Sequence, residues 1–260
     1  MVDIAKSINW DNAKFTEKDD SHDNILMCRG KVTLQKCLIR FTGNNSLIYI
    51  DENAEPISLN MRVGSDSVIY IGKNIFVNKT SDIYATERKN VIIGNEVMFA
   101  KELCFRTADP HPIYDCKTKE RINPSKSILI GDRVWIGQDS LILKGTCIGS
   151  GAIIGGHSVV AGKKISSNSL YAGNPARKIK EGVFYGDHRA THDFDEDEEK
   201  ASMIYHGDDP DRYAYMLDDS TISLEEIDKE WASISKAKDK VKVIERRLVN
   251  NNSKNRFFQS

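Results

Sequence analysis

One histidine of the chain is placed as an acid–base catalyst would be. His111 lies between Pro110 and Pro112 in a polar stretch. Imidazole titrates near neutral pH, so it can take a proton from a hydroxyl, and the two prolines restrict the backbone that presents it. Asp109 can orient the imidazole or can be a turn residue. On its own, a loop histidine can equally be a surface residue, so the hypothesis depends on the surrounding elements.

Those elements repeat every six residues. From Ile130 to Ala161 an aliphatic residue opens each unit, Gly follows it in four of six units, and a small or β-branched residue takes the fifth place. A period of six fits neither an amphipathic helix nor an ordinary strand. It is typical of a parallel β-helix, in which each sextet forms one short strand and a corner. The opening aliphatic then points into a three-sided prism.

The residue before each opening aliphatic points outward. Three sextets make one coil of 18 residues, so residues 18 apart stack on one face, about 4.8 Å per coil. Apolar outward side chains on every face indicate an interface or a ligand groove. We expect Trp135, Ile153 and Tyr171 on one face, Leu141 and Val159 on the second, and Cys147 and Ile165 on the third. His157 also points outward, and we interpret it as a surface or interface residue.

The flanking sequence divides the chain. Residues 1–24 read as a polar lead-in, and residues 25–180 form the β-helix, interrupted by a loop insert at 106–129. Residues 181–260 form a C-terminal extension. Within it, an N-capping motif at Ser223 and a seven-residue apolar spacing predict a helix over 223–249. This helix packs on its own subunit, or pairs with symmetry mates or with the other proteins of a complex.

Composition narrows the class of protein. The net charge of −1 gives no reason to expect nucleic acid or a membrane surface as partner. The five cysteines are odd in number and lack metal-type spacing. Residues 1–24 lack the apolar stretch of a signal peptide, and no window of eighteen apolar residues occurs. We therefore expect a cytoplasmic protein without an integral membrane segment. Only His111 and His157 occur in the helical part, so no metal site is expected.

Three motifs carry a resemblance to a known family. They are Ala108–Ile113 (Ala-Asp-Pro-His-Pro-Ile), Gly131–Gly137 (Gly-Asp-Arg-Val-Trp-Ile-Gly) and Ala172–Arg177 (Ala-Gly-Asn-Pro-Ala-Arg). They resemble the hexapeptide-repeat acetyltransferases, and within them the O-acetyltransferases of bacterial capsule and lipopolysaccharide glycans, including polysialic acid. The resemblance implies a mainly β fold, a left-handed parallel β-helix with an inserted active-site loop and a C-terminal α-helical extension. It also implies a homotrimer, acetyl-CoA as the acetyl donor, and a hydroxyl of a surface polysaccharide as the acceptor.

The resemblance also assigns roles to single residues. His111 matches the catalytic base, and Trp135 matches a tryptophan at the acetyl end of the cofactor, where its N–H can donate. The alternative for Trp135 is packing in a trimer. Phosphates of acetyl-CoA call for cations, of which Lys164 is one nearby. The residues expected to bind the cofactor are Trp135, Gly137, Lys144, Gly155, Gly156, Ser158, Lys163, Arg177 and Lys178. Those that can face an anionic glycan or the cofactor are Lys117, Lys119 and Arg121.

Other functions stay open at this point. Relatives with this fold also acetylate the amino group of nucleotide-linked sugars. A non-catalytic scaffold with a glycan-binding groove is the alternative outside enzymes. A metal-dependent β-helix needs three converging imidazoles, and the sequence of the helical part is poor in them.

Overall fold

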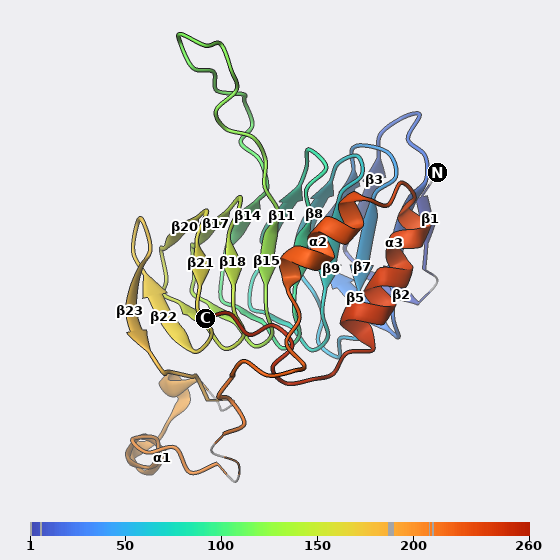
Figure 1. Cartoon of the computed structure of the whole chain (residues 1–260). Coiled ribbons are helices and arrows are strands. Elements are labelled where there is room, and N and C mark those ends of the chain that lie inside the picture. Colours follow the sequence, from blue (N-terminus) through green and yellow to red (C-terminus); the bar gives the residue numbers. More distant parts are fainter. Residues whose placement is uncertain (1, 6, 187–189, 208, 210) are drawn as a thin grey trace.

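The chain folds into a three-sided column of parallel coils. The computed structural model describes residues 2–5, 7–186, 190–207, 209 and 211–260. Each coil contributes one short strand to each side, and like strands of successive coils pair in parallel (Figure 1). We name the three sides face 1, face 2 and face 3 in the order in which the chain crosses them.

Over the described residues, the three faces contain the following strands. Face 1 contains β1 (Val2–Ile4), β4 (Asn24–Cys28), β7 (Leu47–Ile50), β9 (Val68–Ile71), β12 (Val91–Ile93), β15 (Ile128–Ile130), β18 (Cys147–Ile148) and β21 (Lys164–Ile165). Face 2 contains β10 (Phe76–Val77), β13 (Met98–Phe99), β16 (Trp135–Ile136), β19 (Ile153–Ile154), β22 (Ser169–Ala172) and the antiparallel β23 (Arg177–Glu181). Face 3 contains β3 (Lys14–Glu17), β6 (Leu38–Phe41), β8 (Leu59–Val63), β11 (Ser81–Ala85), β14 (Cys104–Arg106), β17 (Leu141–Leu143) and β20 (Val159–Ala161). A separate pair, β2 (Ile8–Asp11) and β5 (Val32–Gln35), belongs to the first coils.

The sextet aliphatics form the core, as the period predicts. Ile136, Ile142, Ile148, Ile154 and Val160 are completely buried inside the column. Burying a Val or Ile side chain contributes about 1.5–3 kcal/mol, so a repeated aliphatic position stabilises every coil. The expected fold class is thereby confirmed: a mainly β parallel β-helix with an inserted loop and C-terminal helices.

The coils shorten along the chain, which corrects two expected stacks. Ile25 pairs with Leu47, 22 residues on, whereas Leu129 pairs with Cys147 after 18 and Cys147 with Lys164 after 17. Because of the shorter last coil, Ile165 points inward and is completely buried.

The same shortening changes the stack on face 2. Leu170, not Tyr171, lies beside Ile153, while Tyr171 is buried in the core. The expected pairing of Trp135 with Ile153 is confirmed, as is that of Leu141 with Val159.

The described residues of the N-terminal lead-in lie against the first coils. Residues 2–4, 8–11 and 14–17 form β1, β2 and β3, which pair with β4, β5 and β6. Trp10 and Phe15 pack against the core among charged neighbours. Both aromatic residues are half-buried, in a segment that is polar on average. Residues 1 and 6 lie outside the described residues.

The loop insert lies where the break in the sextets places it. The chain leaves after β14 and returns at β15, and the intervening segment projects from the corner between face 3 and face 1 (Figure 1). An antiparallel bridge between Tyr114 and Arg121 makes its outer part a hairpin. The projecting loop is therefore a structured element.

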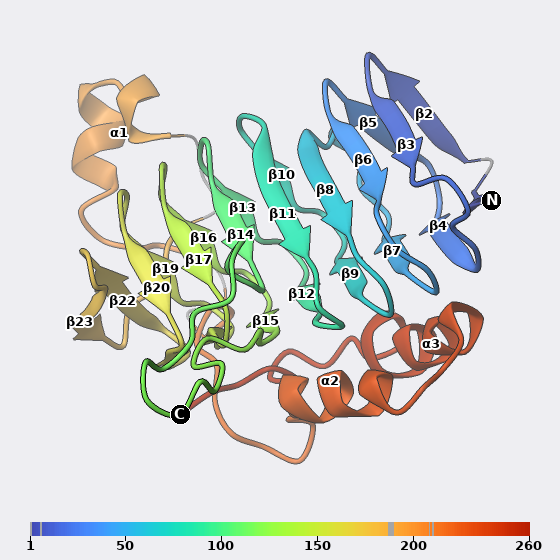
Figure 2. The ribbon, with the colours of Figure 1, turned by 90° about the horizontal axis from the view of Figure 1, so that it is seen from above.

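The C-terminal extension covers face 1. Its first helical elements are a short 3-10 turn, η1 (Thr191–Asp193), and α1 (Glu196–Ala201). Then α2 (Leu224–Ala232), α3 (Ala237–Ile244) and a π-helical turn, η2 (Glu245–Val249), run along the column (Figure 2). Their apolar residues, among them Ile227 and Trp231, join one cluster with outward residues of face 1 such as Tyr70 and Leu129. The predicted helix thus packs on its own chain.

The helix is broken where a column residue binds it. Ser223 caps α2 by accepting a hydrogen bond from the Glu226 amide, as the motif predicts. Between α2 and α3, however, the Asn45 side chain donates to the Ser235 carbonyl and accepts from the Ala237 amide. Because Asn45 meets the backbone needs of a helix end, 223–249 forms two helices where the spacing predicts one. None of the helices in the described residues is long and apolar enough to cross a membrane.

Candidate functional site

The base of the loop insert is held by a cluster of polar side chains. Lys144 follows β17 at the corner from which the loop departs. Its ammonium lies 2.5 Å from the Asp109 carboxylate and donates to the Asn123 carbonyl at 3.0 Å. The Asn123 side-chain amide donates to the same Asp109 carboxylate at 2.8 Å. These donors, Lys144 foremost, lower the pKa of Asp109, so the carboxylate is ionised at neutral pH.

His111 is presented by this cluster. Its side chain is exposed, and its backbone carbonyl accepts a hydrogen bond from the side-chain Nδ2 of Asn123 at 2.9 Å. Asp109 was expected to orient the imidazole or to act as a turn residue. In the structure its carboxylate is engaged by Lys144 and Asn123, so it ties the loop to the column.

Trp135 lies on face 2 and points outward, with 38% of its surface exposed. Its indole makes an edge contact with Tyr185 of the C-terminal extension, at 5.8 Å between ring centroids. Tyr185 in turn covers the Arg133 guanidinium, which lies 4.6 Å from its ring centroid and donates to its backbone carbonyl. The extension thus packs against the indole on one side and leaves part of the ring open.

Within one chain, His111 and Trp135 lie on opposite sides of the column. The chain crosses face 1, face 2 and face 3 in turn, so face 2 is opposite the corner that carries the loop. Figure 2 shows the loop on one side of the column and β16, which contains Trp135, on the other. A single chain therefore does not bring the two predicted catalytic residues together.

Six of the nine predicted cofactor residues lie along the two edges of face 3, whereas Trp135, Arg177 and Lys178 lie in strands of face 2. Lys144 and Lys163 follow β17 and β20, and Gly162 donates its backbone N–H to the Lys144 carbonyl. Along the opposite edge, Gly137 and Gly155 follow β16 and β19, and Gly156 comes next. Between these edges Leu141 is exposed and Val159 is half-buried. Face 3 therefore offers an apolar strip bordered by cations on one side and backbone on the other.

Several of these residues have structural roles. A Cβ on Gly137 would lie 2.4 Å from the Gly156 nitrogen, so glycine is needed there for the coils to stack. Ser158 is completely buried, and its hydroxyl donates to the Gly155 carbonyl. Lys178 pairs with Glu181 within β23, whereas Arg177 is exposed.

The basic residues of the loop differ in how firmly they are held. Lys117 is exposed at the outer end, where its amide donates to Asp115. Lys119 donates to the Cys116 carbonyl at 2.8 Å. Arg121 makes an ion pair with Glu87 at 2.9 Å, which joins the returning limb to the column. The charged groups of Lys119 and Arg121 are thus engaged within the protein, and Lys117 is exposed.

Two residues of the site were not predicted. Asn123 has no motif of its own, although its place before Pro124 at the end of a long polar insert is a signal for a loop-closing residue. Tyr185 lies in a segment without periodicity, so no pattern in the sequence connects it with Trp135.

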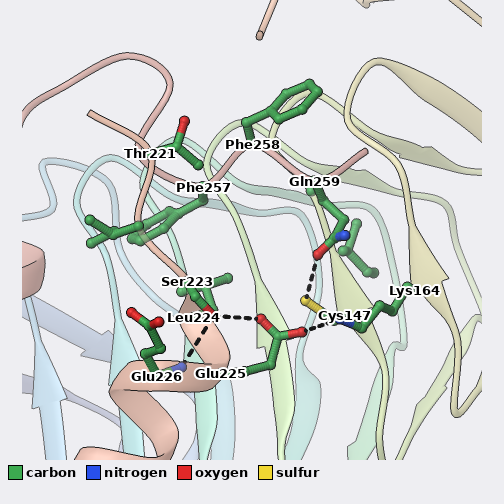
Figure 3. A pocket seen from close by; sticks show the side chains of 13 residues that line it. Cys147, Lys164, Thr221, Ser223, Leu224, Glu225, Glu226, Phe257, Phe258 and Gln259 are labelled. Carbon is green, nitrogen blue, oxygen red and sulfur yellow. Dashed lines mark hydrogen bonds and ion pairs between the residues drawn. The ribbon is translucent and has the colours of Figure 1, made fainter. Parts of the chain in front are cut away.

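A cavity of about 350 Å³ lies away from these residues. It opens between β18, the N-terminus of α2 and the last residues of the chain (Figure 3). Lys164, a candidate for the cofactor phosphates, is paired there with Glu225 at 2.8 Å. Burial raises the pKa of the Cys147 thiol to about 12, so this sulfur is not a nucleophile at neutral pH. The cavity lies at the junction between face 1 and the C-terminal extension.

Comparisons with known proteins support the assignment of the column as a hexapeptide-repeat β-helix. The family described as "Bacterial transferase hexapeptide (six repeats)" matches residues 127–162. A polysialic acid O-acetyltransferase of Neisseria meningitidis is 34% identical over 148 residues, which cover 57% of this chain and 68% of that protein. A polysialic acid O-acetyltransferase of Escherichia coli O1:K1 / APEC is 35% identical over 134 residues, covering 50% of this chain and 43% of the relative. The chain therefore spans less than half of that second relative.

A solved structure agrees over a larger part of the chain. The crystal structure of the polySia-specific acetyltransferase NeuO superposes with a TM-score of 0.59 at 28% identity, covering 78% of this chain and 95% of that one. Together with the six-residue lattice and the Gly-Asp-Arg-Val-Trp-Ile-Gly motif, these similarities show that the chain belongs to the hexapeptide-repeat acetyltransferases, and that it is similar to their polysialic acid O-acetyltransferases.

Proposed function

We propose that this protein transfers the acetyl group of acetyl-CoA to a hydroxyl of an acidic bacterial surface polysaccharide. The observation that carries the proposal is the histidine on a loop whose base is fixed by ionic and hydrogen bonds to the column. The similarity to enzymes that acetylate polysialic acid supports a polymeric acidic acceptor. The family supports acetyl-CoA as the donor.

The reaction needs one base and one electrophilic donor. The His111 imidazole takes the proton of the acceptor hydroxyl, and the oxygen attacks the thioester carbonyl directly. The C–S bond then breaks, and the proton held by the imidazolium passes to the leaving thiolate. Trp135 donates its indole N–H to the oxygen that gains negative charge in the transition state. The products are the acetyl ester and free CoA.

A homotrimer supplies the geometry that one chain lacks. Since His111 and Trp135 lie on opposite sides of a column, the histidine of one subunit meets the tryptophan of its neighbour. Exposed apolar residues support such contacts, namely Ile113, Tyr114 and Ile122 on the loop and, on face 2, Phe76, which lies two strands from Trp135. The long seam between two columns fits the extended pantetheine arm.

The seam is bordered by predicted cofactor residues. Lys163 and Arg177 bind the phosphates of CoA, and the strip on face 3 lines the pantetheine arm. Lys117 contacts the acidic acceptor, since it is exposed near the outer end of the loop. We place the reaction in the cytoplasm, because unpaired cysteines suit a reducing compartment.

A screen for release of CoA thiol tests the proposal. Purified protein and acetyl-CoA are incubated with a panel of surface glycans, including polysialic acid, and with amino sugars linked to nucleotides. We expect thiol release with a glycan that offers only hydroxyls, and an alkali-labile ester in the product. Transfer to amino sugars alone would favour the N-acetyltransferase alternative. Glycan binding without thiol release would favour a scaffold.

A further inference from the structure

Asn123 is buried at the foot of an otherwise exposed loop. Only 8% of its surface is accessible. Its Oδ1 accepts a hydrogen bond from the Ile113 amide at 2.7 Å. Its Nδ2 donates to the His111 carbonyl at 2.9 Å and to the Asp109 carboxylate at 2.8 Å. One carboxamide therefore holds three alternate residues of the segment that carries the imidazole.

The sequence explains why a side chain is needed there. Pro110 and Pro112 have no backbone N–H, so this segment cannot join a regular ladder of hydrogen bonds. His111 precedes a proline, which favours an extended backbone. The segment bends at Pro110 and His111. A carboxamide presents a donor and an acceptor together, so Asn123 can bind the His111 carbonyl and the Ile113 amide at once.

Asn123 is also joined to the column. Its backbone carbonyl accepts from the Lys144 ammonium, which follows β17. The returning limb is held by Arg121, which contacts Glu87 and the Asn123 side chain. The position of the His111 backbone is thus transmitted from the rigid coils through Asn123.

From these contacts we propose that Asn123 is a positioning residue, which fixes the backbone that presents the His111 imidazole to the acceptor hydroxyl. The inference rests on the proposed function, because it takes His111 as the base. The amide group is specifically required. An aspartate at this position would still accept from Ile113 but would have no donor for His111, and it would place a second carboxylate beside Asp109.

Kinetics of Asn123→Ala and Asn123→Asp test the role. A displacement of the base by about 1 Å costs on the order of 100-fold in rate. We expect both variants to lower kcat by about 10- to 100-fold and to leave the KM for acetyl-CoA within about twofold. Ser125→Ala is the matched control, because it removes a different hydrogen bond, to the Glu87 carbonyl, from the same limb. It should retain full activity.

A double-mutant cycle separates positioning from general loop stability. If Asn123 acts through His111, Asn123→Ala should cost little when His111 is already alanine, so the double variant should have about the rate of His111→Ala alone. Additive losses would overturn the proposal, as would a large increase in the KM for acetyl-CoA with unchanged kcat.

Hydrogen exchange provides a readout that does not need activity. In Asn123→Ala the Ile113 amide loses its acceptor, so its exchange should quicken by at least about tenfold, while Ser125→Ala leaves it unchanged. An unchanged exchange rate of the Ile113 amide in both Asn123 variants would refute the positioning role of Asn123. If the exchange effect is present but the wild-type protein releases no thiol, the proposed function is refuted, whereas the hydrogen bonds of Asn123 to the loop are confirmed.

Discussion

The Lys144 ammonium lies 2.5 Å from the Asp109 carboxylate and joins a corner of the column to the loop that presents His111. Lys144 also donates to the Asn123 carbonyl, so two of its hydrogen bonds are directed to the loop. The sequence predicts this lysine as a ligand of the CoA phosphates. The contacts in the structure favour a different role, in which Lys144 fixes the loop that carries His111.

The two roles of Lys144 predict different kinetics. We expect Lys144→Met to lower kcat by about tenfold and to change the KM for acetyl-CoA by less than twofold, because the loop loses a tether but the cofactor loses no contact. Lys163→Met is the comparison, since Lys163 lies one coil further on the same corner. It should raise the KM for acetyl-CoA. Steady-state kinetics of both variants decide the matter, and a raised KM in Lys144→Met would restore the cofactor role.

The same ion pair predicts how stability depends on pH. The pKa of Asp109 is lowered, first by the hydrogen bond from Lys144 and then by that from Asn123. A carboxyl with a lowered pKa in the folded state contributes stability above its unfolded pKa, about 3.9, and loses it as the pH falls through the folded value. The difference in free energy of unfolding between wild type and Asp109→Asn should therefore be constant from about pH 8 to 5.

Urea denaturation across pH checks this expectation. The difference should shrink only below about pH 4. It should be small at every pH, because the Asp109 side chain is 40% exposed and solvent screens the pair. A difference that disappears between pH 7 and 5 would mean that another group controls the loop.

Replacement of His111 tests the chemical step. We expect His111→Ala to lower kcat by about 10²- to 10⁴-fold, the usual effect of losing a general base. His157→Ala is the control, because His157 is also exposed but lies on the column beside Asp139. Equal losses in the two variants, measured by thiol release, would contradict the assignment of the base.

Trp135→Phe separates catalysis from subunit packing. The variant keeps an aromatic ring on face 2 but removes the N–H donor. Loss of a single donor to a developing oxyanion costs about 10²- to 10³-fold in kcat, and we expect a loss of this size without a change in sedimentation. Full activity of Trp135→Phe would show that the indole only packs, and dissociation of the oligomer would point to the interface.

The ion pair between Arg256 and Asp132 predicts how firmly the extension is docked. The Arg256 side chain is 1% exposed and contacts both carboxylate oxygens of Asp132 at 2.7 Å. Removing one partner of a buried pair costs about 3–5 kcal/mol. Arg256→Met should therefore lower the free energy of unfolding by about this amount.

The control for this prediction is Arg246→Met. Arg246 pairs with Glu230 at the surface, and exposed pairs contribute about 0–1 kcal/mol. Urea denaturation monitored by tryptophan fluorescence compares the two variants, because Trp231 of α2 is buried between the extension and face 1. Equal, small effects would show that the extension is held by its apolar contacts alone.

The sequence predicts the column well because its signal is repeated. Each aliphatic that opens a sextet meets the same core, so errors at single positions do not change the period. The place of the insert follows from the interruption of that period. The wrong stacks, Tyr171 and Ile165, come from one residue missing in the last coil, which a fixed period of 18 does not anticipate.

The site is harder to predict from the sequence than the column, because it depends on contacts between segments that are distant in the sequence. His111 and Trp135 stand out by residue type and motif. Asn123 acquires its role only when the loop closes on itself, 12 residues after His111. Contacts of the C-terminal extension are also hard to predict from the sequence. Arg256 pairs with Asp132, 124 residues away, and nothing in the local sequence around Arg256 indicates a buried charge.

The C-terminal helices cover face 1, and this affects how copies of the chain can associate. A ring of three needs two unlike surfaces on every member, one for the copy before and one for the copy after. In the trimer proposed above, face 1 is occupied by the C-terminal helices, so each column meets its neighbours through face 2 and face 3. A chain truncated before α2 would expose Tyr49, Tyr70 and Leu129 as a third apolar surface. Contacts through this surface would join further copies, so the oligomer would no longer have a fixed number of subunits.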